Sequence, residues 1–125
     1  MVKRLLHVGD DPIILEIVQA TFLHDEEVTI TSVRSAFDAL TFVQSLKPDL
    51  FIVNRAMPDM GGFEFILELR KISETATTPI IILSGRARSL GAHNPFQQMA
   101  VAVLEKPVEP DRLRSEAKTL LARVE

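Results

Sequence analysis

The stretch that decides the fold is the uninterrupted apolar run Leu50-Phe51-Ile52-Val53, which is followed at once by the polar residue Asn54. Two further apolar runs of this kind occur later in the chain, at residues 80–83 and 101–104. Short, continuously apolar runs rich in Ile and Val are typical of strands that helices cover on both faces. Strands of this type belong to a parallel sheet, so these runs predict an α/β fold.

The rest of the chain alternates strands with helices. The five predicted strands are residues 5–8, 28–33, 50–53, 80–83 and 101–104. Apolar residues at helical spacing lie between them and after the last one, at residues 14–22, 36–47, 65–72 and 113–124. Pro12 and Pro110 stand at predicted first turns, and the second helix must end before Pro48. Residues 85–93 predict a long loop, and Asn94-Pro95 predicts the start of a short helix over residues 95–100. This alternation predicts a doubly wound, five-stranded parallel sheet with helices on both faces.

Composition limits the classes of function. The chain has 125 residues, of which 46% are hydrophobic and 25% are charged, so we expect a single globular domain over residues 1–125. It is either a whole protein or one domain of a longer chain. A net charge of −3 gives no electrostatic case for nucleic-acid binding, and no apolar run approaches the roughly 20 residues of a membrane span. The absence of cysteine excludes disulfides and agrees with a cytoplasmic location.

Polar residues follow the predicted strands. In doubly wound sheets the functional site lies at the carboxyl ends of the strands. The residues found there are Gly9-Asp10-Asp11 after the first strand, Asn54 after the third, Ser84 after the fourth and Lys106-Pro107 after the fifth. We therefore expect the site among these residues.

Several motifs in this order resemble the receiver domains of bacterial two-component response regulators, the chemotaxis-type receiver family. The motifs that carry the resemblance are Val8-Gly9-Asp10-Asp11-Pro12, Lys47-Pro48-Asp49-Leu50-Phe51-Ile52-Val53-Asn54, Met57-Pro58-Asp59-Met60-Gly61-Gly62, Pro79-Ile80-Ile81-Ile82-Leu83-Ser84-Gly85 and Leu104-Glu105-Lys106-Pro107. The resemblance covers essentially the whole chain, and it implies a flavodoxin-like sheet with strand order 2-1-3-4-5.

The resemblance also implies roles for single residues. Receivers take a phosphoryl group from a kinase phosphohistidine onto an Asp at the end of the third strand, with Mg²⁺ beside it. Carried over by position, Asp10 is a metal ligand and Ala56 supplies a backbone carbonyl to the metal. Ser84 and Lys106 are the residues that contact phosphoryl oxygens. Phosphoryl transfer needs such groups because it depends on positioning and on neutralisation of oxygen charge.

The departures from the family pattern concern the same chemistry. Asn54 stands at the phosphoacceptor position, and an amide cannot form the acyl phosphate that a carboxylate forms. Gly9 occupies the first position of the family's usual acidic pair, and Asp10 the second. If the alignment with the family motif is shifted by one residue, Asp10 and Asp11 form the pair instead. We prefer the alignment without the shift because Pro12 then begins the first helix. At least one carboxylate is missing in either register, so we expect weak Mg²⁺ binding or none, and no other cofactor. Without an aspartate at position 54, Lys106 is expected to pair with Asp10 or with the Asn54 carbonyl.

Two hypotheses follow for function. The position of the family's switch aromatic is Val103, and the usual output face, which here spans about residues 85–104 and the last helix, looks rebuilt. The leading hypothesis is a receiver that cannot accept phosphate at Asn54 and acts through protein contacts on that face, with a histidine kinase, a phosphotransfer domain or an output domain as partner. The alternative is a conventional phospho-accepting receiver that carries an Asp-to-Asn substitution at position 54. We do not expect an enzyme, since no Gly-rich phosphate loop follows the first strand.

Other residues that could carry chemistry have structural interpretations. His7 lies within the first strand and is expected to pack in the core, and His24 and His93 lie in no metal motif. Gly61 and Gly62 are expected to meet a need for positive φ in the turn that contains Asp59.

Overall fold

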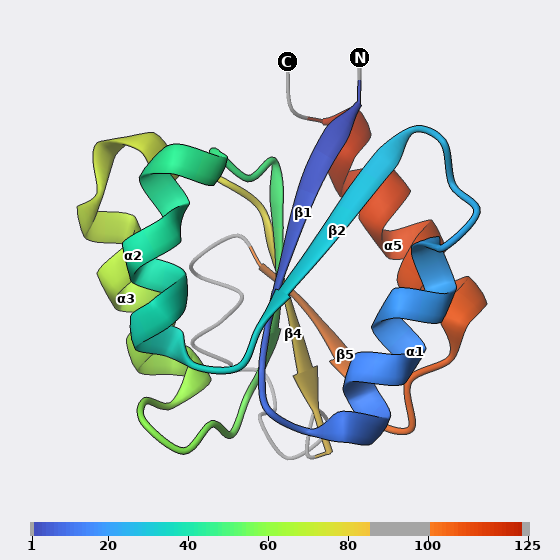
Figure 1. The fold of residues 1–125 in the computed structure, drawn as a ribbon, viewed down its shortest axis with the longest axis horizontal. Coiled ribbons are helices and arrows are strands. Elements are labelled where there is room, and N and C mark those ends of the chain that lie inside the picture. The colour runs from blue at the N-terminus through green and yellow to red at the C-terminus, as the bar shows by residue number, and fades with distance from the viewer. Residues whose placement is uncertain (1, 86–100, 124–125) are drawn as a thin grey trace.

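The computed structural model describes residues 2–85 and 101–123, which form a three-layer α/β domain (Figure 1). The strands are β1 (Lys3–Val8), β2 (Val28–Val33), β3 (Leu50–Asn54), β4 (Ile80–Ser84) and β5 (Val101–Glu105). The helices are α1 (Pro12–Phe22), α2 (Ala36–Leu46), α3 (Gly62–Lys71) and α5 (Pro110–Ala122), with a short 3-10 helix at Ser73–Thr75 that was not predicted. The predicted helix over residues 95–100 lies outside the described residues.

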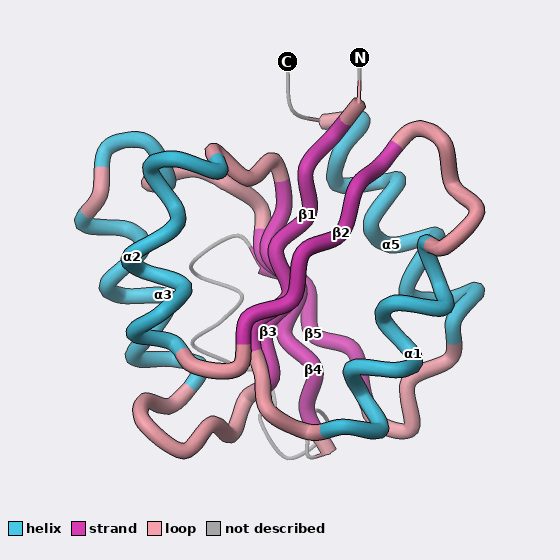
Figure 2. The backbone as a smooth tube through the Cα atoms, in the orientation of Figure 1, coloured by secondary structure: helices cyan, strands magenta, loops and turns pink. Residues whose placement is uncertain are grey.

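The five strands form one parallel sheet in the order β2-β1-β3-β4-β5, which confirms the predicted fold class. Strand β3 lies in the middle, with β1 on one side and β4 on the other (Figure 2). Every residue of β3 and of β4 is buried. The chain order reverses its direction between β1 and β3, so the carboxyl ends of these two strands form the switch point where sites occur in such sheets.

Each face of the sheet has its own core. Helices α1 and α5 cover one face, and α2 and α3 cover the other (Figure 1). Alternate residues of each strand point to opposite faces, so Leu5 and Ile52 pack against α1 and α5 whereas Leu6 and Val53 pack against α2 and α3. Of the described residues, no helix is long and apolar enough to cross a membrane.

Prolines and polar caps set the helix ends. Pro12 and Pro110 are the first residues of α1 and α5, as predicted. The Ser35 side chain accepts a hydrogen bond from the backbone N–H of Asp38 at the start of α2. Helix α2 ends at a left-handed residue, Lys47, with φ of 48°, directly before Pro48.

The expectation of positive φ at Gly61 and Gly62 is wrong. Gly61 has φ of −67°, and the only described non-glycine residue with positive φ is Lys47. Gly62 is needed for a different reason, because a Cβ atom there would lie 3.0 Å from the Asn54 carbonyl oxygen and 3.0 Å from the Arg55 Cα. The glycine lets the first turn of α3 lie directly on the end of β3, where the Gly62 N–H donates to the Arg55 carbonyl at 2.8 Å.

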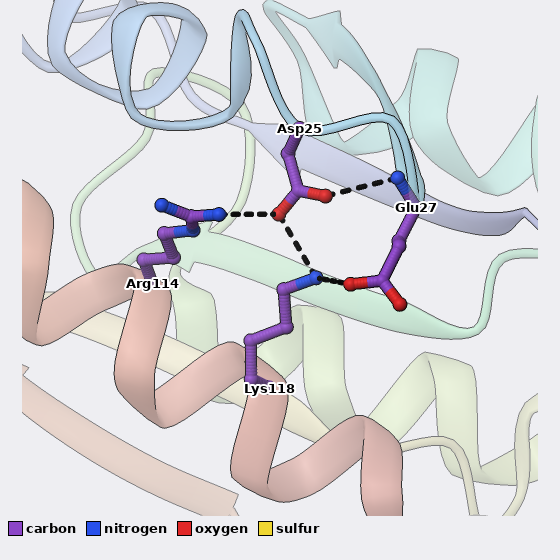
Figure 3. Close-up of polar contacts among 4 residues, drawn as sticks. All are labelled: Asp25, Glu27, Arg114 and Lys118. Atoms are coloured by element: carbon purple, nitrogen blue, oxygen red, sulfur yellow. Dashed lines mark hydrogen bonds and ion pairs between the residues drawn. The ribbon is translucent and has the colours of Figure 1, made fainter.

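A buried carboxylate joins the loop after α1 to α5. Asp25 has a side chain only 4% exposed; its Oδ2 lies 2.9 Å from the Lys118 Nζ and 3.4 Å from an Arg114 nitrogen, and its Oδ1 accepts from the Glu27 N–H at 2.9 Å (Figure 3). Lys118 also contacts Glu27 at 2.9 Å. The hydrogen bond from Lys118 is the main cause that lowers the pKa of Asp25.

Replacing Lys118 by Met should destabilise the fold by about 1–3 kcal/mol, because it leaves a buried carboxylate without its main partner. Lys71→Met is the matched control: it breaks an exposed ion pair with Glu68 at 2.9 Å and should change the free energy of unfolding by about 0–1 kcal/mol. Urea denaturation at neutral pH measures both values. Since the folded-state pKa of Asp25 is lowered, its contribution should be present above pH 4 and be lost as the pH falls through that pKa. Equal effects of the two substitutions would contradict this account.

Candidate functional site

The polar residues at the strand ends meet at one edge of the sheet. Asn54 is the last residue of β3 and Ser84 is the last residue of β4. Gly9 and Lys106 directly follow β1 and β5; the Gly9 N–H donates to the Val33 carbonyl and the Lys106 N–H donates to the Ser84 carbonyl, each at 2.9 Å. The parallel register therefore brings together the positions that the sequence placed at the site.

Asn54 is 1% exposed, and its side chain occupies the space beside Gly9. A Cβ atom added to Gly9 would lie 2.3 Å from the Asn54 Nδ2 and 2.4 Å from its Cγ, which is closer than any real contact. The Asn54 amide can therefore occupy this space only because residue 9 is a glycine. On the other side, the Asn54 Oδ1 lies 3.4 Å from the Nε2 of His7.

His7 is the centre of a polar chain across three strands and one helix, buried at His7 and Asn54 and partly exposed at Ser32 and Gln19. It is 0% exposed, and its Nδ1 lies 3.1 Å from the hydroxyl of Ser32, its register partner on β2. The Gln19 amide on α1 donates to the same hydroxyl at 2.9 Å. The imidazole thus has a partner at each nitrogen, as a buried polar ring requires. The expectation that His7 packs in the core is confirmed, and its contact with Asn54 adds a link to the site.

Burial controls the charge of His7. Loss of contact with water lowers its pKa from 6.5 to about 4, and the hydrogen bond with Asn54 opposes this shift. The imidazole is therefore neutral at pH 7. The polar chain from Gln19 through Ser32 and His7 to Asn54 consists of an amide, a hydroxyl, a neutral imidazole and a second amide, none of which is charged.

The predicted metal ligands differ in what they contact. Asp10 is exposed, and so is Ala56 in the loop after β3. Asp11 caps α1: its Oδ1 accepts from the backbone N–H of Ile13 at 2.9 Å and of Ile14 at 3.3 Å. A carboxylate held in this way serves the helix, which favours Asp10 as the acidic residue that faces the site.

These donors do not fit a tight magnesium site. Mg²⁺ is held by hard oxygen ligands, normally with one or two carboxylates among them. Position 9 has no side chain, and the Asn54 oxygen is neutral and directed at His7. No group of three or more His, Cys, Asp or Glu side chains that could hold a metal ion occurs in the parts of the chain that the structure describes.

The cationic side of the site contains a residue that the sequence did not predict. Arg55 follows Asn54, and its guanidinium donates to the buried Ser84 hydroxyl at 3.5 Å. Lys106 is half-buried. The expected pairing of Lys106 with Asp10 or with the Asn54 carbonyl is not among the contacts of the described residues. The Asn54 side-chain oxygen contacts His7 instead.

Asp59 is a second residue whose role was missed. Its carboxylate accepts from the backbone N–H groups of Ala36 at 3.3 Å and Phe37 at 3.0 Å, at the start of α2. These hydrogen bonds, with that of Phe37 the largest cause, lower the pKa of Asp59. A polar residue that interrupts an apolar strand, as His7 does, signals a buried partner; no comparable signal in the sequence links Asp59 with α2.

Fold and site together define a doubly wound α/β domain with a polar site at its switch point. Residues 5–118 match the response regulator receiver domain family, and the chain belongs to that family. It is 32% identical over 120 residues to response regulator Rre1 of Synechocystis, covering 95% of this chain and 52% of that protein. The chain thus spans about half the length of this curated relative.

Solved structures agree with this assignment. The chemotaxis response regulator CheY4 of Vibrio cholerae superposes with a TM-score of 0.84 at 26% identity, covering 96% of this chain and 99% of that one. A sensor protein from Polaromonas gives a TM-score of 0.85 at 28% identity and covers 96% of each chain. The protein is therefore a receiver domain of two-component signalling, and such domains interact with histidine kinases and output domains.

Titration of His7 should make the protein less stable in mild acid. The unfolded chain takes up a proton near pH 6.5, whereas the folded chain does so only near pH 4, so stability should fall by about 3 kcal/mol between these values. His7→Gln retains a hydrogen-bonding amide but cannot titrate, and it should remove this pH dependence. Urea denaturation of both proteins at pH 7 and at pH 4.5 measures the difference. An unchanged pH dependence in His7→Gln would contradict the assignment.

The contact between positions 9 and 54 predicts a coupled pair of substitutions. Gly9→Ala should destabilise the protein by about 1–3 kcal/mol, because the new methyl group overlaps the Asn54 amide. In an Asn54→Ala background the same substitution should cost clearly less, since the Nδ2 and Cγ atoms that overlap most are gone and only the Cβ contact at 3.0 Å remains. Gly85→Ala is the control, because a Cβ atom there meets nothing within 4 Å. Additive effects of the substitutions at positions 9 and 54 would rule out the steric dependence.

Proposed function

We propose that this receiver domain does not accept a phosphoryl group at Asn54 and acts as a phosphorylation-independent protein-interaction module. The observation that carries the proposal is the burial of the Asn54 amide between Gly9 and His7. An amide at this position is not a nucleophile for phosphoryl transfer. The close packing of the Asn54 amide over Gly9 also connects its presence to a second departure from the family pattern, the missing side chain at position 9.

Charge at the site supports the same proposal. Receiver domains typically bind Mg²⁺ at the phosphorylation site. Here Asp10 is the acidic residue available at the end of β1, while Arg55 and Lys106 bring positive charge to the ends of β3 and β5. A divalent cation is less favoured by this balance than by a cluster of carboxylates. We therefore expect weak Mg²⁺ binding or none.

The position of the family's switch residue points in the same direction. Val103 on β5 is partly buried and packs against the core beneath α2 and α3. A branched aliphatic side chain has no ring to turn inward when a pocket is filled. We propose that this protein contacts a histidine kinase, a phosphotransfer domain or an output domain through residues 85–104 and α5, in the cytoplasm, without enzymatic activity of its own.

A conventional receiver with an Asp-to-Asn substitution is the alternative. It predicts that Asn54→Asp alone restores the acceptor and the metal site. The steric contact at Gly9 and the hydrogen bond from His7 argue for the first proposal, because a single recent substitution leaves both unexplained.

The decisive test treats the protein and two variants with acetyl phosphate and Mg²⁺, and measures phosphorylation by intact mass. We expect no phosphorylation of the unmodified chain or of Asn54→Ala, which serves as the control without any carboxylate. Asn54→Asp separates the two proposals: full, Mg²⁺-dependent phosphorylation of this variant supports the alternative, and its failure to bind Mg²⁺ or to be phosphorylated supports the first. Stable, Mg²⁺-dependent phosphorylation of the unmodified chain would falsify the proposed function.

A further inference from the structure

The hydrogen bonds around His7 have one arrangement that satisfies every member. If the neutral imidazole carries its proton on Nε2, it donates to the Asn54 Oδ1 at 3.4 Å. Its Nδ1 then accepts from the Ser32 hydroxyl at 3.1 Å, and that hydroxyl accepts from the Gln19 amide at 2.9 Å. In the opposite tautomer the Ser32 oxygen would receive two donors, and its own hydrogen would have no acceptor among the described contacts. The geometry therefore favours the Nε2–H form.

This arrangement fixes the orientation of the Asn54 amide. Its oxygen faces the N–H of His7, and its NH₂ group lies over the Cα of Gly9, where the nearest nitrogen would be 2.3 Å from an added Cβ. With the proton on Nε2, turning the amide over would place its NH₂ group against the N–H of the imidazole, donor against donor. The side chain is thus held in one orientation by a hydrogen bond on one side and by close packing on the other.

We propose that His7 is a positioning residue for position 54, and that a carboxylate introduced there forms a buried ion pair with a protonated His7 instead of a free phosphoacceptor. This inference rests on the proposed function, because it predicts that restoring the acidic residue alone is not sufficient. It concerns His7, which lies on β1 two residues before Gly9 and outside the set of residues that the family resemblance assigns to phosphoryl chemistry.

Burial supplies the physical reason. Asn54 and His7 are 1% and 0% exposed, so a charged carboxylate at position 54 loses most of its contact with water. A buried charge is strongly unfavourable unless it is paired. The imidazole lies within hydrogen-bonding distance and can take up a proton, and attraction between the two charges is strong where water is excluded.

No other charged group takes the place of His7 in this role. The partners of its ring are Ser32 on β2 and Asn54 on β3, with Gln19 on α1 behind the serine, and all three are uncharged. The charged groups at the same edge of the sheet are Asp10, Arg55 and Lys106. None of them contacts the imidazole within the residues that the structure describes, and Arg55 is directed at Ser84.

The test compares the unmodified protein, Asn54→Asp, His7→Leu and His7→Leu/Asn54→Asp by ¹⁵N NMR of the imidazole groups. In the unmodified protein His7 should show the neutral Nε2–H tautomer at pH 7. In Asn54→Asp it should be an imidazolium at pH 7, because its pKa rises above the ordinary value of 6.5. The exposed His24 is the reference in the same spectra.

The second readout is magnesium affinity, measured by titration of backbone amide shifts. His7→Leu/Asn54→Asp should bind Mg²⁺ at least about tenfold more tightly than Asn54→Asp, because the carboxylate is released and the competing positive charge is removed. If His7→Leu does not fold, His7→Gln takes its place, since its amide can keep the hydrogen bonds but cannot carry a charge.

Each outcome bears on the inference separately from the proposed function. The Nδ1–H tautomer in the unmodified protein, a neutral His7 in Asn54→Asp at pH 7, or equal Mg²⁺ affinity of the single and double variants overturns it. Phosphorylation of the unmodified chain overturns the proposed function, whereas the tautomer of His7 in that chain is measured without any phosphodonor. The two failures are therefore distinguishable.

Discussion

Burial of the central strand β3 on both faces is the constraint on which the rest of the structure depends. All five residues from Leu50 to Asn54 are removed from solvent, and helices cover both sides of the sheet. For the first four residues this burial supplies the apolar contacts of two cores. The fifth is polar, and a buried amide is tolerated only with partners of its own. The contacts of Asn54 with His7 and Gly9 are thus a direct consequence of the strand that holds the domain together.

The same constraint explains the charge of the site. Carboxylates at the end of a buried strand need cations or metal ions beside them, whereas this chain has neutral residues, Gly9 and Asn54, at the ends of β1 and β3. The neutral imidazole of His7 suits a neutral amide, just as a charged partner would suit a carboxylate. The edge of the sheet keeps the outline of a receiver site, but its central contacts are those of a packed polar core.

The architecture could be predicted from the sequence because apolar runs, prolines and caps act locally. The runs at 50–53 and 80–83 marked buried parallel strands, and Pro12 and Pro110 marked the starts of α1 and α5. The site's location followed from the strand ends. The contact between His7 and Asn54 could not be predicted, because it joins residues 47 positions apart and depends on strand register and side-chain direction. The role of Gly62 could not be predicted for the same reason. The sequence suggested a positive φ in a turn, whereas the glycine lets the backbone of α3 approach the end of β3 closely.

The anchoring of Asp59 has a consequence for how such a domain can be regulated. Its two hydrogen bonds hold the loop after β3 to the start of α2. A loop held by the carboxylate of one of its own residues has internal support for its position, so on the function proposed above its contact with α2 does not require an occupied site. Under that proposal, a surface that includes this loop would be available to partners at all times. Control over the interactions would then depend on the amount of the protein and on competition for its partners.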